Sequence, residues 1–420
     1  MTRRRVAVTG LGLTVPFGTD PGSVFDRLMA GESAIRPFTP DPALPNGTRA
    51  VPAVYCAGFD SEATLGRTTT FLTDRYAQLG LTAALAAWQD AGLPCSAPPE
   101  EMLNGAVCWG TGLGGTRSVE LAYFDVLQRG RARTSPMLIV MGMHNAAAAH
   151  VAMRLGLGGP ATTTSVACAS SAIAIGEALR LIRSCEADVV VAGGSEAPLT
   201  AGMLLAWDAM RVLARGEGDA AALACRPFHA DRAGLVLGEG GASLVLESYE
   251  HAQRRGARIY AELAGYGASC DHHHLAQPLA AGQMRALRAA LKSAELNADE
   301  VDYVNAHGTG TVEGDPIEIE ALRAVFDAHA EAVAVSSTKS MLGHMLGATG
   351  AVEAVITVLA LSRQQVPPTA HLDRIDPACA GVRHVARVGE SLPLQAALTS
   401  SFAFGGSNAV LAFRRNVATQ

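Results

Sequence analysis

The chain has 420 residues, of which 49% are hydrophobic and 17% charged, and its net charge is −6. This length exceeds what one hydrophobic core usually supports, so we expect two domains, or two halves packed as one unit. The acidic balance argues against a nucleic-acid-binding protein. The eight cysteines form no C-x-x-C pair. This fits neither a zinc site nor a disulfide framework, so we expect no metal and a cytoplasmic location.

The N-terminal stretch MTRRRVAVTGLGLTVPFG resembles a signal peptide, because arginines precede an apolar run. Glycines and threonines interrupt the run and no A-x-A site follows, so a β-strand over residues 5–9 entering a glycine turn is the better interpretation. No segment offers the roughly 20 apolar residues of a membrane span, and we expect no membrane association.

Strand-like and helical segments alternate along the rest of the chain. In the first half the expected strands are NGAVCWG, ADVVVAGG and residues 242–246, and the expected helices are 119–128, 169–184 and a charged helix ending at Gly256. In the second half the expected elements are a helix at 282–294, the strand VDYVNAH, a helix at 317–329, the strand AVAVSST, a helix near 350–361 and two final strands around a glycine turn. Such alternation predicts an α/β fold with strands buried on both faces.

The two halves, which we divide as residues 1–255 and 256–420, resemble each other weakly. In each, a potentially reactive residue precedes a small-residue helix: Cys168 before ASSAIAIGEALRLI, and His344 before MLGATGAVEAVITVLAL. No long linker separates the halves, so we expect them to share a core. Internal duplication would bring both residues to one seam.

The segment GTGLGG, residues 110–115, follows a strand and fits the G-x-G-x-x-G pattern of dinucleotide sites. No clear acidic residue follows a second strand about 20 positions later, and in a chain with 44 glycines the match is weak. A glycine-rich dinucleotide enzyme therefore stands as a weak alternative.

Cys168 has the position of an activated thiol. A helix beginning near Ala169 would lower the pKa of the thiol through its dipole and its free N–H groups. Free cysteine is also among the most buried residue types, so a packed thiol is the competing interpretation. Taken alone, the stretch TSVACASSAIAIGEAL does not decide between them.

Candidate partners for Cys168 stand in two loops of the second half. His307 follows a predicted buried strand in VNAHGTGTVEGDPIE, ahead of Asp315 and Glu318. SSTKSMLGHMLGATG supplies His344 and Lys339, one of only two lysines among 33 basic residues. Each histidine alone is better interpreted as a core residue. Two of them at such loops, with a cysteine in the matching place of the other half, favour catalysis.

Four motifs in register, VACASS, NAHGTGT, STKSMLGH and SFAFGGSN, resemble the β-ketoacyl-ACP synthase family of the thiolase superfamily. The likeness covers essentially the whole chain and is strongest to the type II elongating synthases. It implies a thiolase-like fold, in which two duplicated βαβαβαββ halves pack as five αβαβα layers. Two positions depart from the family: Ala403 in SFAFGG replaces a glycine, and Trp207 stands where a smaller aromatic is common.

The resemblance also implies residue roles. Cys168 would be the acylated nucleophile, His307 and His344 the decarboxylation and condensation pair, and Lys339 their support in contact with Glu318. Further roles follow for an oxyanion hole and gate (Cys168, Phe402, Phe404), supporting carboxylates (Asp315, Glu318, Asp271), an acyl pocket (Leu113, Leu138, Trp207) and pantetheine contacts (Thr309, Thr311). Asp271 would act as a latch of a loop whose run His272–His274 we interpret as polar rather than metal-binding.

The implied activity is decarboxylative condensation of a Cys-bound acyl chain with malonyl-ACP, giving 3-oxoacyl-ACP in fatty acid or type II polyketide or polyene biosynthesis. No cofactor is implied, because the substrates are carried on the phosphopantetheine of acyl carrier protein. The chain would form a homodimer, or a heterodimer with a chain-length-factor-like subunit. The alternative is that the chain itself is such a non-elongating partner, although in those subunits the nucleophile is usually replaced.

Overall fold

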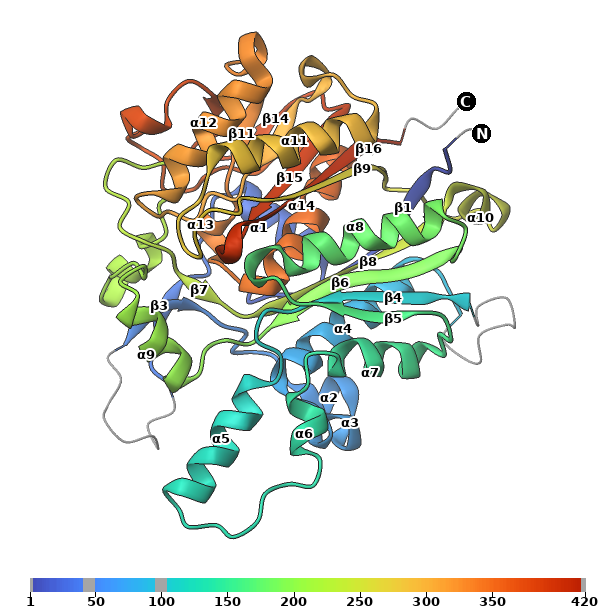
Figure 1. The fold of residues 1–420 in the computed structure, drawn as a ribbon, viewed down its shortest axis with the longest axis vertical. Helices are drawn as coiled ribbons and strands as arrows, with labels where there is room; N and C mark the ends of the chain where they lie inside the picture. The colour runs from blue at the N-terminus through green and yellow to red at the C-terminus, as the bar shows by residue number, and fades with distance from the viewer. Residues whose placement is uncertain (1–2, 41–49, 95–103, 417–420) are drawn as a thin grey trace.

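The computed structural model describes residues 3–40, 50–94 and 104–416. Its central feature is an 11-stranded mixed sheet, which runs through both halves of the chain (Figure 1). The N-terminal half contributes, in order across the sheet, β1 (Val6–Thr14), β8 (Gly240–Ser248), β6 (Val189–Glu196), β4 (Ala106–Gly110) and β5 (Ala161–Thr164). The C-terminal half contributes β9 (Ala261–Cys270), β16 (Ser407–Arg415), β15 (Ala396–Phe402), β10 (Tyr303–Asn305), β11 (Ala334–Ser336) and β13 (Arg383–His384).

The two sets of strands repeat one pattern of directions. From β1 outward, the successive pairs are antiparallel, antiparallel, parallel and parallel, and from β9 through β11 the sequence of directions is the same. Within the large sheet, the two sets of strands meet at a short antiparallel pairing of β1 with β9, at Ala7 with Glu262 and Val8 with Ala261. The predicted duplication is thus present in the topology.

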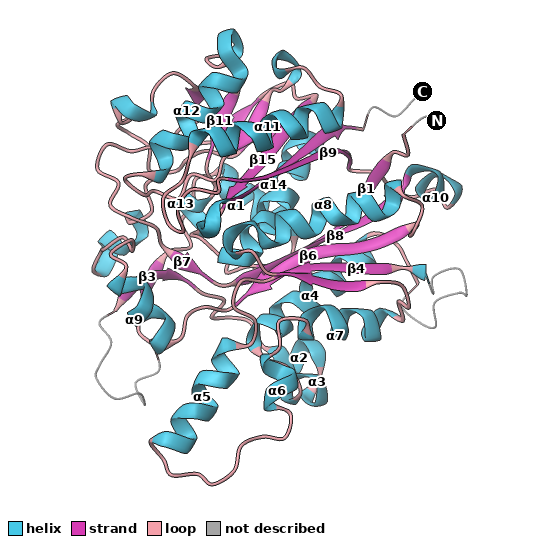
Figure 2. Ribbon diagram, in the orientation of Figure 1, coloured by secondary structure: helices cyan, strands magenta, loops and turns pink. Residues whose placement is uncertain are grey.

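Helices form three layers around these strands (Figure 2). On the outside of the N-terminal half lie α4 (Arg75–Asp90) and α7 (Ala146–Leu155), and on the outside of the C-terminal half lie α11 (Ala280–Ala294) and α12 (Gly314–Phe326). Between the halves lie α8 (Ser170–Arg183) and α14 (Thr349–Arg363), which contact each other and strands of both halves. The two sets of strands of the large sheet form separate layers on either side of α8 and α14, so the five layers confirm the predicted αβαβα architecture.

Paired glycines allow the outer helices to approach the sheet at matching places. A Cβ at Gly10 of β1 would lie 2.1 Å from the Ala87 carbonyl oxygen of α4. A Cβ at Gly267 of β9 would lie 2.2 Å from the Ala286 carbonyl oxygen of α11. The expectation that β1 ends in a glycine turn after residue 9 is therefore wrong: the strand continues to Thr14, because its glycines make room for α4.

The central helix α14 is unusually apolar. Residues 346–363 form an 18-residue helical stretch with a mean hydropathy of 1.4, which by length and composition alone could cross a membrane. In the fold 89% of this stretch is buried, between the strands of the two halves. Its apolar character is that of a core helix.

Two helices, α5 (Thr116–Leu127) and α6 (Leu138–Gly142), extend away from these layers (Figure 1). Neither contains a buried residue, and their most exposed apolar side chains are Leu127 at 75% and Ile139 at 74%. The remaining helices are α1 (Pro21–Met29), α2 (Ser61–Leu65), α3 (Arg67–Phe71), α9 (Ala201–Ala209), α10 (Tyr249–Arg254) and α13 (Lys339–Leu342). The remaining strands form two small sheets, made of β2 (Arg36–Phe38), β3 (Val51–Val54) and β7 (Leu237–Gly238), and of β12 (Gln365–Val366) and β14 (Glu390–Ser391).

Candidate active site

The predicted nucleophile lies in a tight turn between β5 and α8. A single 3-10 turn, Ala167–Ala169, precedes the helix, and Ala167 adopts a φ of +49°, which L-residues rarely adopt. The turn places Cys168 two residues before the first residue of α8, Ser170, with the cysteine 6% exposed. Small neighbours leave space around the sulfur, since Ala169 and Ser170 fill little volume.

The second half has the same kind of junction before α14. The 3-10 turn Leu346–Ala348 precedes the helix, and Leu346 adopts a φ of +44°. By this register Cys168 corresponds to Gly347, and His344 lies three residues earlier. The two reactive residues are therefore not equivalent positions of the repeat, although both lie at the seam as predicted.

Cys168, His307 and His344 form one buried cluster. The Sγ atom of Cys168 lies 3.0 Å from Nε2 of His344, whose Nδ1 lies 2.9 Å from the Thr349 hydroxyl. The ring of His307 meets that of His344 edge to face, with 5.3 Å between centroids. Thus the structure brings together the three residues that sequence analysis singled out.

Burial sets the protonation states in this cluster. Loss of solvent raises the pKa of the Cys168 thiol to about 11, although the charge of Lys339 and the backbone N–H groups of Phe404 and Cys168 act to lower it. The expectation of a lowered thiol pKa is therefore wrong, because desolvation outweighs the helix start. Burial, aided by Lys339, also holds the pKa of His307 and His344 well below the usual range. At neutral pH the site contains a thiol and two neutral imidazoles.

The three side chains also satisfy the spacing of a metal site, with one ligand atom from each within 4.8 Å of the others. The nearby ammonium of Lys339, which lowers the pKa of all three groups, opposes a bound cation. The electrostatic environment favours an anion, such as a thiolate or an enolate.

Lys339 is a buried ion-pair residue, but its partner is not the expected one. Its Nζ lies 2.5 Å from Oε1 of Glu353 on α14, with both side chains at most 2% exposed. Glu318 instead accepts hydrogen bonds from the backbone N–H groups of His307 and Gly308, at 2.7 and 2.6 Å. Lys339 and Glu318 thus form no ion pair, although the charge of Lys339 acts to lower the pKa of the Glu318 carboxyl. Glu318 orients the loop that carries His307.

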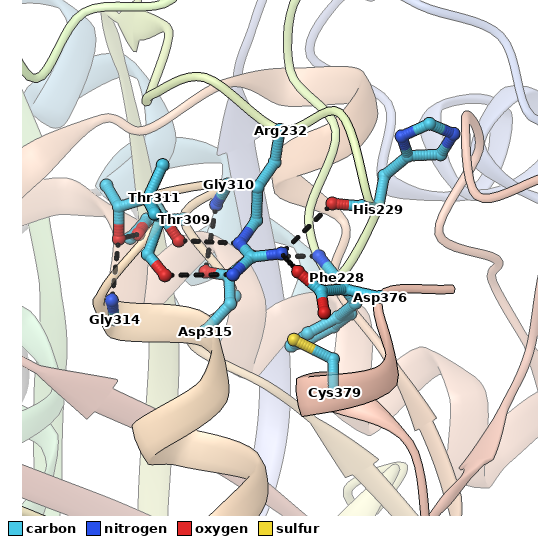
Figure 3. A network of polar contacts seen from close by, with 12 residues as sticks. Phe228, His229, Arg232, Thr309, Gly310, Thr311, Gly314, Asp315, Asp376 and Cys379 are labelled. Carbon is cyan, nitrogen blue, oxygen red and sulfur yellow. Dashed lines mark hydrogen bonds and ion pairs between the residues drawn. The ribbon is translucent and has the colours of Figure 1, made fainter. Parts of the chain in front are cut away.

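That loop, residues 307–314, is attached at several further points, shown in Figure 3. Asp315 accepts from the backbone N–H groups of Gly310 and Phe228, at 3.1 and 2.8 Å. Arg232 donates to the carbonyl oxygens of Thr311 and Val312, at 2.9 and 2.8 Å, and pairs with Asp376 at 2.5 Å. His307 therefore projects from a loop fixed by a buried polar network.

A cavity of about 470 Å³ leads to the cluster. Its lining includes most of the remaining residues predicted for the site: Trp207, Thr309, Thr311, Asp315, Glu318, Phe402 and Phe404. Phe404 stacks on Trp207, with 5.9 Å between ring centroids. An elongated ligand can therefore reach Cys168 through this cavity, past the two threonines and the Trp207–Phe404 stack.

The turn that carries Phe404 contains one of the two departures from the family pattern, Ala403. Ala403 has a φ of −102°, which any residue adopts, whereas Gly405 and Gly406 have φ values of +82° and +75°. Alanine at 403 therefore adds no backbone strain, because the two glycines take the strained positions.

Asp271 connects this turn to the loop that contains His272, His273 and His274. Its side chain accepts from the Asn408 amide at 2.7 Å and from the Leu279 backbone N–H at 3.0 Å, and its own N–H donates to the Gly406 carbonyl at 2.8 Å. His274 accepts from two N–H groups of its own loop, at Ala276 and Gln277. The arrangement matches a polar loop fastened at Asp271.

Two of the predicted acyl-pocket residues do not line this cavity. Leu113 packs against the same core cluster as Cys168, while Leu138 lies half-buried on α6. The GTGLGG loop itself is occupied by protein: the N–H groups of Gly112 and Leu113 donate to the buried carboxylate of Glu196, at 2.6 and 3.1 Å. The dinucleotide interpretation is therefore wrong, because these donors are not free for a phosphate.

Sequence reasoning missed four residues that organise the site: Glu353, Thr349, Arg232 and Glu196. Glu353 and Thr349 contact Lys339 and His344, 14 and five positions away along the chain. Arg232 and Glu196 act through distant partners, and Glu196 also accepts from the Gly347 N–H at 3.0 Å and so links the halves. For Glu353 the sequence does contain a signal, because it is the one charged residue within the apolar segment AVEAVITVLAL.

Comparison with known proteins supports this assignment. Residues 3–252 match the family described as beta-ketoacyl synthase, N-terminal domain, and residues 260–373 match its C-terminal domain. The chain is 41% identical to Nodulation protein E of Rhizobium sp. (strain N33), covering 98% of this chain and 99% of that protein.

It is also 38% identical to 3-oxoacyl-[acyl-carrier-protein] synthase 2 of Vibrio cholerae, covering 99% and 100%. Among solved structures it is similar to the ishigamide ketosynthase/chain length factor, with a TM-score of 0.91 and 31% identity over 99% of this chain and 100% of that one. The chain belongs to the β-ketoacyl synthase family of condensing enzymes.

Proposed function

We propose that Cys168, His307 and His344 carry out decarboxylative condensation of an acyl chain with malonyl-ACP, giving 3-oxoacyl-ACP. The observation that carries this proposal is the approach of the Cys168 sulfur to His344 Nε2 at 3.0 Å, with the neutral ring of His307 beside it. The cavity of about 470 Å³ supports it by giving a thioester arm access to the sulfur.

In the first step the Cys168 sulfur attacks the thioester carbonyl of acyl-ACP. The carbon–sulfur bond of the donor breaks, the carrier thiol leaves with the proton, and the acyl group remains on Cys168. The backbone N–H groups of Phe404 and Cys168, which already stabilise negative charge at this sulfur, are proposed as the oxyanion hole, with Phe402 and Phe404 as its gate.

In the second step malonyl-ACP loses CO2, and the electron pair of the broken bond forms a thioester enolate. Neutral imidazoles donate N–H bonds to the enolate oxygen, and the lowered pKa values of His307 and His344 keep both rings neutral. The enolate carbon then attacks the acyl carbonyl, and the Cys168 sulfur leaves as the new carbon–carbon bond forms.

The supporting roles follow from the contacts of each side chain. Lys339 is proposed to favour negative charge in the cluster, Glu318 and Asp315 to position the His307 loop, and Asp271 to fasten the gate turn. Thr309 and Thr311 are proposed as pantetheine contacts. Trp207 with Leu113 and Leu138 stays a prediction for the acyl pocket, as does the division of the chain at residues 255 and 256.

Acyl carrier protein is the proposed partner, with the substrates on its phosphopantetheine and no separate cofactor or metal. A dimer is also proposed, as homodimer or heterodimer, supported by the apolar side chains exposed on α5 and α6. A cytoplasmic location is supported by the free state of the seven cysteines that lie in the described residues.

The second candidate, a non-elongating chain-length-factor-like subunit, has one observation in its favour: the likeness to a ketosynthase/chain length factor structure. The retained cysteine and its contact with His344 favour the condensing role. Either fatty acid or type II polyketide or polyene substrates would fit the same catalytic residues.

The test is to incubate the protein with defined acyl-ACPs and to identify the acyl group on Cys168 by mass spectrometry. Cys168→Ala should abolish both acylation and condensation, while Cys168→Gln should keep malonyl-ACP decarboxylation and lose condensation. Unchanged product formation by Cys168→Ala would favour the chain-length-factor role. Loss of decarboxylation in Cys168→Gln would contradict the roles of the two histidines.

A further inference from the structure

A second cavity, of about 330 Å³, lies where the two halves meet at the start of β1 and shares no residue with the active-site cavity. It is lined by residues of both halves, and six of them are arginines: Arg3, Arg4, Arg5, Arg183, Arg414 and Arg415. Only two carboxylates, Glu262 and Glu295, line it as well. The cavity thus gathers a positive charge of four in a chain whose net charge is −6.

Four of these arginines have no carboxylate partner among the described residues. Arg5 pairs with Glu262 at 2.6 Å, and Arg4 pairs with Asp188 and Glu250, which lie outside the cavity lining. By contrast, Arg3, Arg183 and Arg414 donate to the carbonyl oxygens of Ser293, Ala264 and Glu295. Arg415 is exposed at the end of β16, and none of the ion pairs in the described chain includes it. Positive charge is therefore available to a ligand.

Arg183 is the arginine whose charge is least compensated in this cavity. Its Nε is buried and has no hydrogen-bond partner in the structure, which is costly for a guanidinium group. Burial and the neighbouring charge of Arg3 lower its pKa to about 10. An anion bound beside the guanidinium group would offset both effects.

We propose that this cavity is a binding site for a diphosphate group. Guanidinium groups bind phosphate oxygens through paired, parallel hydrogen bonds, and several arginines around one cavity suit a ligand with several phosphate oxygens. The arginines come from the start of β1, from α8 and from the end of β16, so their spread favours a diphosphate over a single phosphate. The ligand would join residues of both halves beside the short β1–β9 pairing.

The diphosphate could be inorganic pyrophosphate or could belong to a nucleotide or coenzyme A. Isothermal titration calorimetry on the full chain distinguishes these sources, with pyrophosphate, ADP and coenzyme A titrated at one ionic strength set with sodium chloride. We expect saturable binding of all three with a stoichiometry of one. Tighter binding of ADP or coenzyme A than of pyrophosphate would show that the site also contacts the organic part.

Two substitutions on the same helix make a matched pair. Arg183→Met removes a cavity arginine, whereas Arg180→Met removes an exposed arginine that pairs with Glu177 outside the cavity. Both change the net charge equally. We expect Arg183→Met to weaken pyrophosphate binding about tenfold or more, and Arg180→Met to leave it within about twofold. Neither residue contacts the active site, so condensation should continue in both.

Equal weakening by the two substitutions would overturn the proposal, since it would reduce the effect to general electrostatic attraction. The absence of saturable pyrophosphate binding to the unaltered chain would overturn it as well. If Arg183→Met unfolds, the double variant Arg3→Met with Arg415→Met replaces it, and unchanged pyrophosphate affinity in that variant would contradict the site.

Discussion

The two halves share one topology, yet they supply opposite kinds of chemistry to the seam. The N-terminal junction offers a thiol among small side chains, Ala167, Ala169 and Ser170, with no charged residue in the turn. The C-terminal half offers the polar groups: two histidines, and the buried pair of Lys339 with Glu353. A repeated scaffold thus separates the nucleophile, which needs room, from the groups that control charge, which need fixed partners.

The two halves divide the electrostatics of the site between them. Cys168 is buried so completely that its own helix start does not keep the thiol pKa low. The stabilising charge comes across the seam, from Lys339. Four measurements test this division.

Removal of either histidine should nearly stop enolate formation. We expect His307→Ala and His344→Ala each to slow malonyl-ACP decarboxylation by about 100-fold or more, because each removes one donor to the enolate oxygen. The measurement is release of labelled CO2 in the Cys168→Gln background, where condensation is absent. A rate within a few-fold of that background in either variant would contradict the assignment of the pair.

The Lys339–Glu353 pair should matter to folding as much as to charge. Lys339→Met leaves a buried carboxyl without its partner and should reduce the free energy of unfolding by about 3 kcal/mol, measured by urea denaturation. The double variant Lys339→Met with Glu353→Leu should regain most of that stability but not the activity. Recovery of both would mean that the lysine is only a packing element.

The thiol of Cys168 should behave as an ordinary buried thiol in a pH titration. With a pKa of about 11, its thiolate fraction, and therefore its rate of alkylation by iodoacetamide, should rise about tenfold per pH unit between about pH 7 and about pH 9. Both histidines stay neutral over that range, because their pKa values lie below it. A plateau near neutral pH would instead indicate a thiolate–imidazolium pair.

The strained turn before α8 should give the smallest effect. Ala167→Gly relieves a positive φ and should stabilise the protein by up to about 1 kcal/mol, measured as a shift in Tm. Ala169→Gly is the control, since Ala169 has a φ of −90° and gains nothing from glycine. Destabilisation by both variants to the same degree would show that the turn stores no strain.

Much of this arrangement could be predicted from the sequence, because the alternation of strand-like and helical segments and the glycine-rich motifs can be recognised within short stretches of the chain. The alternating segments gave the α/β layers, and the motifs around Cys168, His307 and His344 marked the seam. What could not be predicted depends on distant contacts. The pairing of Glu353 with Lys339 depends on how α13 and α14 pack, and the raised thiol pKa reflects burial that no single stretch reveals.

The GTGLGG loop is a motif that was recognised in the sequence but whose binding partner could not be predicted from it. Its spacing suits a phosphate, but a carboxylate from the end of β6, Glu196, occupies its N–H groups. The residue that fills the loop is more than 80 positions away from it in the chain. The motif therefore indicated backbone N–H groups that bind an anion, but not that the anion is the carboxylate of Glu196.

The burial of α14 has a consequence for synthesis of the chain. The strands of the N-terminal half that contact this helix, β1, β6 and β8, are made before it, but β15 and β16, which cover it from the other side, are made last. A nascent chain that has reached Arg363 thus exposes one side of an apolar helix until residues 396–415 emerge from the ribosome. The last two strands, β15 and β16, therefore cover the exposed side of α14 only at the end of synthesis. A chain truncated before Ala396 should aggregate and depend on chaperones.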